Sequence, residues 1–135
     1  QGYPATLELK KLKKKHVFNN NNKKILIENV SAQHGNIKSI CYILNKKLAY
    51  ASDVSLIYEN TLNKFKNLDY FIIDCLWYRE HPSHYNLDKV LKLIDIIKPK
   101  KTILTNMHSD LDYMQLKKIL PNNVIPGYDG LSMKL

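Results

Sequence analysis

Four groups of polar residues that can bind metal ions lie beside short apolar runs in this sequence. The groups are Gln33-His34-Gly35, Tyr50-Ala51-Ser52-Asp53, His81-Pro82-Ser83-His84 and Thr105-Asn106-Met107-His108-Ser109-Asp110. Each sits where a predicted strand gives way to a loop, and α/β folds collect catalytic groups in such loops. No His-x-His-x-Asp-His cluster occurs. The pattern therefore indicates part of a metallohydrolase site on an α/β scaffold.

The first part of the chain is typical of antiparallel β structure. We expect strands over residues 6–12, 25–30, 37–44 and 47–50, with a turn at Asn45-Lys46. Short connections between them favour antiparallel pairing. The stretch from the lysines at 10–15 to the asparagines at 19–22 indicates a hairpin loop rather than a binding tract.

The second part alternates helices with buried strands. We expect a short helix spaced by Leu62, Phe65 and Leu68, then strands at 70–74 and 102–104, and short closing strands at 124–125 and 131–135. A turn at 128–130 separates the last two.

Two longer helices are predicted by apolar spacing and capping residues. The first starts near Asn86 or Leu87, with Asn86 as N-cap and Pro99 after its end. Its apolar stripe comprises Leu87, Val90, Leu91, Ile94 and Ile97. The second spans about 110–120, with Ser109 or Asp110 as its cap and Pro121 as its stop.

This order predicts a mixed sheet covered by helices on one face. The chain offers few elements to cover the other face. We therefore expect an exposed apolar face that a missing half or a second copy covers.

The composition is basic, with 21 Lys and Arg against 12 Asp and Glu and a net charge of +9. Arg79 is the only arginine. Proteins that recognise a nucleic-acid sequence favour arginine for bidentate contacts to bases. The Lys, Asn and Ile abundance also fits AT-rich coding sequence, so nucleic acid is not the expected partner. A positive field would still attract a phosphate-bearing substrate.

Several features indicate a soluble cytoplasmic setting. Cys41 and Cys75 lie in apolar runs, which favours core thiols over a disulfide or ligand pair and fits a reducing compartment. No apolar run reaches about 18 residues, so no membrane span is expected. The residues at 1–4 lack an initiator Met and an apolar signal segment, which indicates the middle of a longer protein or a processed chain.

The candidate residues differ in how strongly their types point to chemistry. His34 and Asp53 follow consecutive strands, and a carboxylate can bridge two cations about 3.5–4 Å apart, as a two-metal hydrolase needs. His84, just before a helix, suits a general acid, although a surface-loop role stays open. Pro82 places the His81-x-x-His84 pair in a loop, so that spacing carries little weight. Asp74 either orients a histidine or caps a loop.

Four further residues read as structural. Asp110 and Asp112 fit the acidic first turn of a helix. Tyr113 and Tyr128 fit packing positions with hydrogen-bonding tips.

Taken together, these residues resemble the C-terminal half of metallo-β-lactamase-fold hydrolases, with the PhnP-like phosphodiesterase group as the nearest type. The resembling segments occur in family order and cover most of the chain: residues 33–35, 48–54, 72–76, 81–87, 103–105, 110–113 and 126–130. The resemblance implies an α/β (α+β) fold class, namely one half of a four-layer αβ/βα sandwich with two metals at its rim.

The resemblance also implies roles for individual residues. His34 would bind one metal, Asp53 would bridge both, and His84 would protonate the leaving oxygen or contact the phosphate. Asp74 and His81 would not bind the metals themselves but would orient the residues that do. The metals would be Zn²⁺ or Mn²⁺, and they would lower the pKa of water toward about 7 for attack on phosphorus.

Two departures from the family pattern matter. The His-x-His-x-Asp-His motif, which supplies most ligands in the family, is absent, and a structural zinc site normally takes four protein ligands and a catalytic site three. The family's last metal histidine corresponds to Asn106, which can ligate through its carbonyl oxygen. His108 can substitute if the loop turns it inward. A branch of the group has a similar Thr-Asn-x-His sequence, so a variant site and a decayed site both stay open.

The leading prediction is one partial domain over residues 1–135, the C-terminal half of a phosphodiesterase-like metallohydrolase. It would act on a small phosphate ester and be inactive by itself. One alternative is a split-gene or degenerate fragment that binds an N-terminal half-chain or forms a homo-oligomer. Another is an RNA-processing nuclease of the same superfamily.

Overall fold

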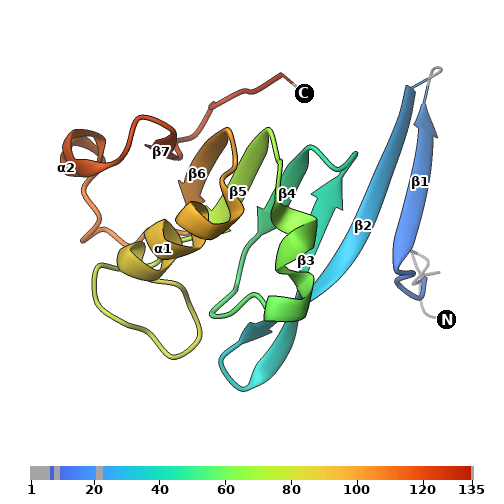
Figure 1. The fold of residues 1–135 in the computed structure, drawn as a ribbon, viewed down its shortest axis with the longest axis horizontal. Helices are drawn as coiled ribbons and strands as arrows, with labels where there is room; N and C mark the ends of the chain where they lie inside the picture. The colour runs from blue at the N-terminus through green and yellow to red at the C-terminus, as the bar shows by residue number, and fades with distance from the viewer. Residues whose placement is uncertain (1–6, 8–9, 21–22, 135) are drawn as a thin grey trace, which may run out of the picture.

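The computed structural model describes residues 7, 10–20 and 23–134. Its centre is a seven-stranded sheet in the order β1-β2-β3-β4-β5-β6-β7, which is also the order along the chain (Figure 1). The strands and helices are β1 (Lys15–Asn20), β2 (Lys23–His34), β3 (Ile37–Leu44), β4 (Leu48–Ala51), η1 (Glu59–Phe65), β5 (Tyr70–Asp74), α1 (Leu87–Ile97), β6 (Lys101–Thr105), α2 (Tyr113–Ile119) and β7 (Val124–Pro126).

The sheet changes direction in the middle. Strands β1 to β4 pair antiparallel, whereas β4 to β7 pair parallel. Short turns suffice for the antiparallel half, and crossovers through η1 and α1 connect the parallel strands. The predicted mixed sheet is therefore confirmed. Its consequence for the site is that β4, β5 and β6 end on the same edge.

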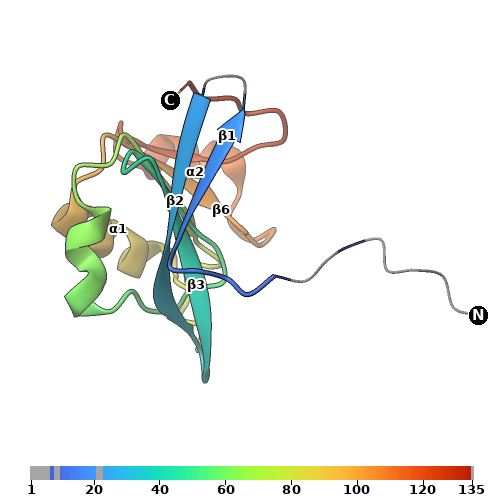
Figure 2. The same ribbon diagram turned by 90° about the vertical axis from the view of Figure 1, so that its right-hand side faces the viewer.

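The helices η1 and α1 cover one face of the sheet (Figure 2). Phe65 of η1 meets Phe71 of β5 with ring centroids 5.9 Å apart, and both side chains are fully buried. Val90 and Ile97 of α1 are also buried in this core. The sequence stripe missed Leu93, which is buried, whereas Leu91 is only partly covered.

The other face of the sheet is partly open. Directly paired residues project their side chains to the same face, which places Tyr42, Tyr50, Ile72 and Ile103 in one row across four strands. Tyr50 keeps 40% of its surface exposed, as does Ile40 on β3. Ile103 is buried, and a cavity of about 430 Å³ lies between it and the chain at Leu131 and Met133.

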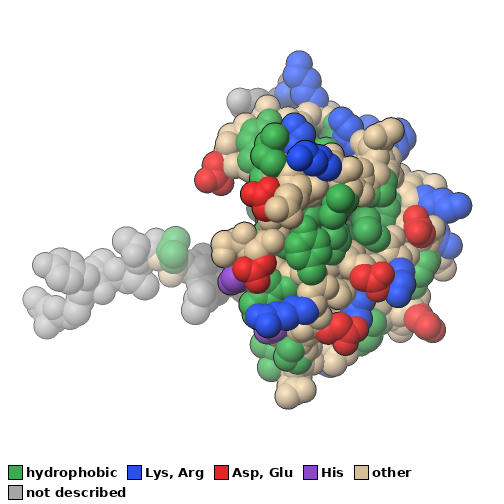
Figure 3. Space-filling view, turned by 90° about the vertical axis from the view of Figure 1, so that its left-hand side faces the viewer, with side chains coloured by type: hydrophobic (Ala, Val, Ile, Leu, Met, Phe, Trp, Pro, Cys, Tyr) green, Lys and Arg blue, Asp and Glu red, His purple; other side chains and the backbone are tan. Residues whose placement is uncertain are grey.

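The helix α2 lies beside β7 at the far edge. Figure 3 views that end of the molecule and shows hydrophobic side chains in the middle, surrounded by charged ones. Met114 and Ile119 of α2 are each 60% exposed. None of the described helices is long and apolar enough to cross a membrane.

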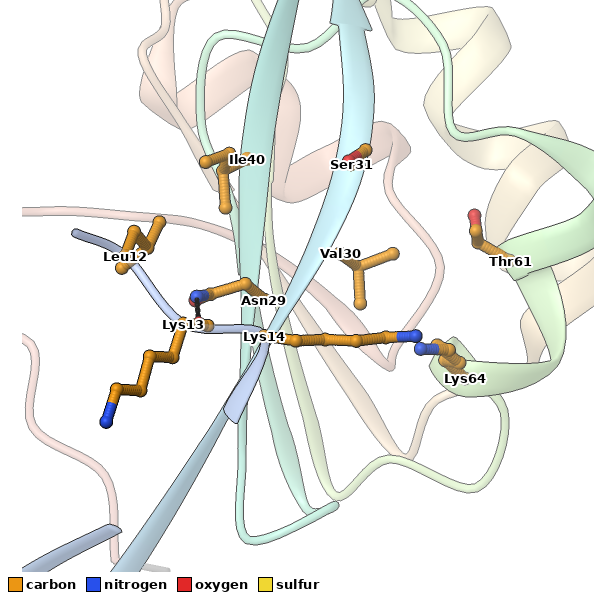
Figure 4. Close-up of a pocket in the computed structure, with 9 residues that line it drawn as sticks. All are labelled: Leu12, Lys13, Lys14, Asn29, Val30, Ser31, Ile40, Thr61 and Lys64. Carbon is orange, nitrogen blue, oxygen red and sulfur yellow. Dashed lines mark hydrogen bonds between the residues drawn. The ribbon is translucent and has the colours of Figure 1, made fainter. Parts of the chain in front are cut away.

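A groove of about 500 Å³ lies along β2 where its pairing with β1 has ended. Figure 4 shows Lys13, Lys14 and Lys64 around it, together with the amide of Asn29, which donates to the carbonyl of Lys13. Its lining contains none of the four polar groups, so the candidate site lies elsewhere.

Several local predictions were wrong. The stretch read as a loop contains β1, because residues 15–20 pair with β2 in register from Lys15↔Glu28 to Asn20↔Lys23. Residues 7 and 10–12 form no strand, and the rest of the predicted strand at 6–12 lies outside the described residues.

The end of the chain also differs from expectation. The cap of α2 is Asp112, whose carboxylate accepts from the backbone N–H of Gln115, so the helix starts later than Ser109 or Asp110 implied. Residues 131–134 form no strand, and Leu135 lies outside the described part.

Candidate metal centre

The four polar groups of the sequence meet at one edge of the sheet. His34 is the last residue of β2, Asp53 follows β4, and Asp74 ends β5. His84 lies in the loop before α1, and Asn106 follows β6. Because β4, β5 and β6 are parallel and adjacent, the loops after them come together here.

Three potential ligands converge at this edge. One ligand atom from each of His34, Asp53 and His84 can be chosen so that all lie within 4.8 Å of one another. The two imidazole rings meet edge to face, with centroids 4.7 Å apart. Within the described part of the chain, this is the one group of histidine, cysteine and acidic side chains with metal-binding spacing.

Hydrogen bonds fix both imidazoles. Nδ1 of His34 lies 2.6 Å from the carbonyl oxygen of Ser83, and Nδ1 of His84 lies 2.5 Å from Oδ2 of Asp74. A carbonyl and a carboxylate can only accept, so each Nδ1 carries the proton. Nε2 of each ring is thereby left with its lone pair for a metal or a proton.

Asp74 connects three loops through its buried carboxylate. The residue is fully buried. Oδ2 accepts from the backbone N–H of Val54 at 3.1 Å as well as from His84, and Oδ1 accepts from Nδ2 of Asn106 at 3.2 Å. These donors compensate for the loss of water around the charge. Asp74 therefore lies behind the three converging ligands rather than among them.

The backbone at Asp53 presents its carboxylate to solvent. Its φ of 50° is in the left-handed region, which Asp tolerates better than most residues. The carboxylate has no hydrogen-bond or ion-pair partner among the described residues, although it sits with His34 and His84. A cation would supply the missing opposite charge.

A glycine allows the His34 loop to approach the His84 loop. Gly35 has a φ of +57°, and a Cβ there would lie 3.0 Å from Cβ of Ser83. The side chain of Ser55 bonds the backbone N–H of Gly35. This close approach lets the carbonyl of Ser83 reach His34.

Two further histidines, His81 and His108, lie around Trp77 at the rim. Ring centroids of His81 and His108 are 5.2 and 5.1 Å from that of Trp77, and the guanidinium of Arg79 lies 4.3 Å over the indole. His81 also meets His84 at 5.1 Å. Nδ1 of His108 faces Asp110 at 3.3 Å, and the structure does not bring His108 into the group with His34.

Both thiols lie in the core, apart from the converging ligands. Cys41 and Cys75 are buried and unpaired, as the sequence indicated. Burial raises the pKa of each thiol to about 12. Neither thiol belongs to the group of converging ligands.

Sequence reasoning missed three contributors to this edge. They are the carbonyl of Ser83, the backbone N–H of Val54 and the ring of Trp77. Two of these act through the backbone, where residue type gives no signal. Trp77 lies outside the four polar groups. Only its position between Asp74 and His81 in the sequence could have drawn notice.

The ligand set fits a first-row divalent metal. Two imidazole nitrogens and a carboxylate oxygen are typical ligands of zinc, and a His₂-carboxylate set leaves coordination positions for water and substrate. The fixed Nδ1 protons and the unpartnered Asp53 carboxylate agree with that use.

Comparison with known proteins gives consistent matches. A family model described as "Beta-lactamase superfamily domain" matches residues 3–107. The crystal structure of a new diphosphatase from the PhnP family is 26% identical with a TM-score of 0.79, and the match covers 82% of this chain and 44% of that one. The metallo-β-lactamase-fold protein YhfI from Bacillus subtilis is 14% identical with a TM-score of 0.67, covering 89% and 53%.

One curated relative carries a different name. An octanoyltransferase from Porphyromonas gingivalis is 28% identical over 110 residues, which make up 79% of this chain and 22% of that protein. The chain thus spans less than half the length of both this relative and the diphosphatase.

Proposed function

Because the chain belongs to the β-lactamase superfamily domain family and has the metallo-β-lactamase fold, we propose that it forms part of the active site of a metal-dependent phosphate-ester hydrolase. The observation that carries the proposal is the convergence of His34, Asp53 and His84. The similar diphosphatase favours a phosphate ester as substrate. The net charge of +9 favours an anionic substrate as well.

Each residue of the group has a distinct proposed role. His34 and Asp53 would hold a Zn²⁺ or Mn²⁺ ion, through Nε2 and the carboxylate. When bound, the ion supplies positive charge to the phosphate oxygens and lowers the pKa of water. His84 faces the same point and donates a proton from Nε2 to the leaving oxygen, while Asp74 stabilises the charged ring through Nδ1.

We further propose that this chain is a C-terminal half-domain and that other ligands come from a His-x-His-x-Asp-His segment. The chain spans 44% of the diphosphatase, and its own group offers three ligands at most, with His84 included. A two-metal site needs more ligands than these three. The chain alone should therefore bind metal weakly and show no turnover.

Native mass spectrometry with Zn²⁺ or Mn²⁺ tests the metal centre. We expect weak binding by the unaltered chain and none by His34→Ala or Asp53→Ala. His108→Ala is the matched control and should bind as the unaltered chain does. Equal binding by the unaltered chain and by His34→Ala would contradict the proposed ligands. His84→Ala separates its two possible roles, because loss of metal would make His84 a ligand instead of a proton donor.

Hydrolysis of bis(p-nitrophenyl) phosphate tests the reaction. We expect no turnover by the chain alone and metal-dependent turnover after a fragment bearing His-x-His-x-Asp-His is added. Turnover by the chain alone would overturn the half-site proposal. In the complemented enzyme, His84→Ala should slow esters of poorly acidic alcohols more than p-nitrophenyl esters, because only the former need the proton.

The open sheet face favours a second candidate, a homo-oligomer or partner-binding module. Tyr50 and Ile40 keep 40% of their surfaces exposed there. Such a module would fold and associate without catalysis. The mass in solution distinguishes an oligomer from a monomer.

A further inference from the structure

We propose that Asn106 is a positioning residue that acts on His84 through Asp74. In this assignment Asn106 does not ligate the metal. Its side-chain amide holds one oxygen of Asp74, which keeps the other oxygen on Nδ1 of His84 and leaves the lone pair of His84 on Nε2. The part of this assignment that concerns catalysis rests on the proposed function, whereas the tautomer of His84 is a property of the chain itself.

The backbone brings Asn106 to Asp74. Thr105, the last residue of β6, is paired with Asp74, the last residue of β5. Asn106 follows with a φ of 57°, a left-handed conformation that asparagine adopts more readily than most residues. The chain thus turns its side chain back over the end of the neighbouring strand.

The chemistry of the contact fixes the orientation of the amide. Nδ2 of Asn106 lies 3.2 Å from Oδ1 of Asp74 and 3.5 Å from Nδ1 of His84. An amide oxygen in that place would face a carboxylate oxygen, and both are acceptors. The NH₂ group therefore faces Asp74. Because Nδ1 of His84 donates to Asp74, the carboxylate is the acceptor for Asn106.

The two carboxylate oxygens of Asp74 have different hydrogen-bond partners. Oδ2 serves the imidazole and the backbone of Val54, while Oδ1 serves Asn106. Without Asn106, Oδ1 of Asp74 would have no hydrogen-bond donor among the described residues. The buried carboxylate could then rotate so that Oδ1 shares the donors that now bond Oδ2. Rotation would weaken the bond to His84 and allow the tautomer with the proton on Nε2.

The tautomer of His84 can be read directly by long-range ¹H–¹⁵N NMR on the metal-free chain. We expect the unaltered chain to hold the proton on Nδ1. In Asn106→Gly the ratio of the two tautomers should fall on the order of tenfold, as loss of a hydrogen bond to a charged group implies. Glycine suits the positive φ, so this variant should fold.

Two further variants complete the test. Asn67→Gly is the matched control, because Asn67 is an exposed asparagine with a φ of 59° in the turn before β5. Asn106→His offers an N–H to Asp74 and should restore the Nδ1 tautomer. An unchanged His84 tautomer in Asn106→Gly would overturn the proposal. A changed tautomer in a chain that binds no metal would support it while contradicting the proposed function.

Discussion

At the scale of single residues, a buried carboxylate organises the candidate site. Asp74 is buried from solvent, and its carboxylate bonds residues of three loops, among them His84. A buried charge is stable only when donors surround it. The same donors that stabilise Asp74 thereby fix where His84 points, so stability and site geometry depend on one side chain.

Asp74→Asn should lower the stability of the fold and disturb the geometry of the site. The amide keeps the volume but replaces one acceptor oxygen with a donor, which would face an N–H or His84. We expect a loss of roughly 2–4 kcal/mol of unfolding free energy. Metal affinity should decrease about 10–100-fold, because Asp74 also holds the backbone N–H of Val54 next to the proposed ligand Asp53. Urea denaturation and metal titration measure the two effects.

Asp129→Asn provides the control for this substitution. Asp129 is exposed in the turn after β7, so its variant should match the unaltered chain in both measurements. If Asp74→Asn bound metal as tightly as Asp129→Asn, Asp74 would have no part in orienting the site.

At the scale of elements, the start of α1 positions the loop that carries His84. Asn86 is the N-cap: its side chain accepts from the backbone N–H of Lys89 at 3.1 Å and donates to the carbonyl of Tyr78 at 3.1 Å. The backbone N–H of Leu87 also bonds the carbonyl of Trp77. The capping residue therefore closes the 77–86 loop as well as the helix.

Asn86→Ala should affect stability and the site together. We expect a loss of about 1–2 kcal/mol of unfolding free energy for the cap, with shifted NMR signals for His84. Asp112→Ala, which removes the cap of α2, should cost about 1 kcal/mol and leave His84 unchanged. Identical His84 signals in both variants would show that the Asn86 bonds do not position the loop.

At the scale of the whole molecule, the core is asymmetric. The face under η1 and α1 is closed and contains both cysteines, whereas the opposite face keeps Tyr50 and Ile40 exposed. A sheet with one such face is expected to pair with another layer. Its thiols and its open face can be tested separately.

The thiols should make stability depend on alkaline pH. Burial raises the pKa of Cys41 and Cys75 from 9.0 to about 12. In the unfolded chain the thiols lose their protons at lower pH than in the folded chain. Their contribution is therefore fully present below about pH 9 and is lost as the pH rises toward 12.

Alkylation and denaturation check this behaviour. Iodoacetamide at pH 8 should modify both thiols only after unfolding, and the unfolding free energy should fall between pH 9 and 12. The decrease should be smaller in Cys75→Ala. Rapid modification of the folded chain would contradict burial of the thiols.

The open face should make the chain associate. We expect the mass from analytical ultracentrifugation to rise with concentration, and Tyr50→Glu to shift the chain toward monomer because a charge in a sheet interface is costly. Met114→Glu is the control, since Met114 is exposed on α2, which lies beside the edge strand β7. Equal masses for the two variants at every concentration would exclude the open face as the interface.

Local sequence signals were enough to predict most of the elements and the edge where the site lies. Apolar runs, the Asn86 cap and the prolines act locally, so strands β3 and β5 and helix α1 could be predicted within a residue or two. Polar residues at strand ends, such as His34 and Asp53, marked the edge for the same reason. The family resemblance, confirmed by the match over residues 3–107, rests on these local signals.

Which of those residues meet depends on the packing of the strands and loops. His108 and Asn106 are two residues apart, yet the ring of the first meets Trp77 edge to face while the second bonds Asp74. That outcome depends on the parallel register of β5 and β6 and on the backbone turn at Asn106. Likewise β1 exists because it pairs with the following strand β2 in a hairpin, and this pairing overrides its polar composition.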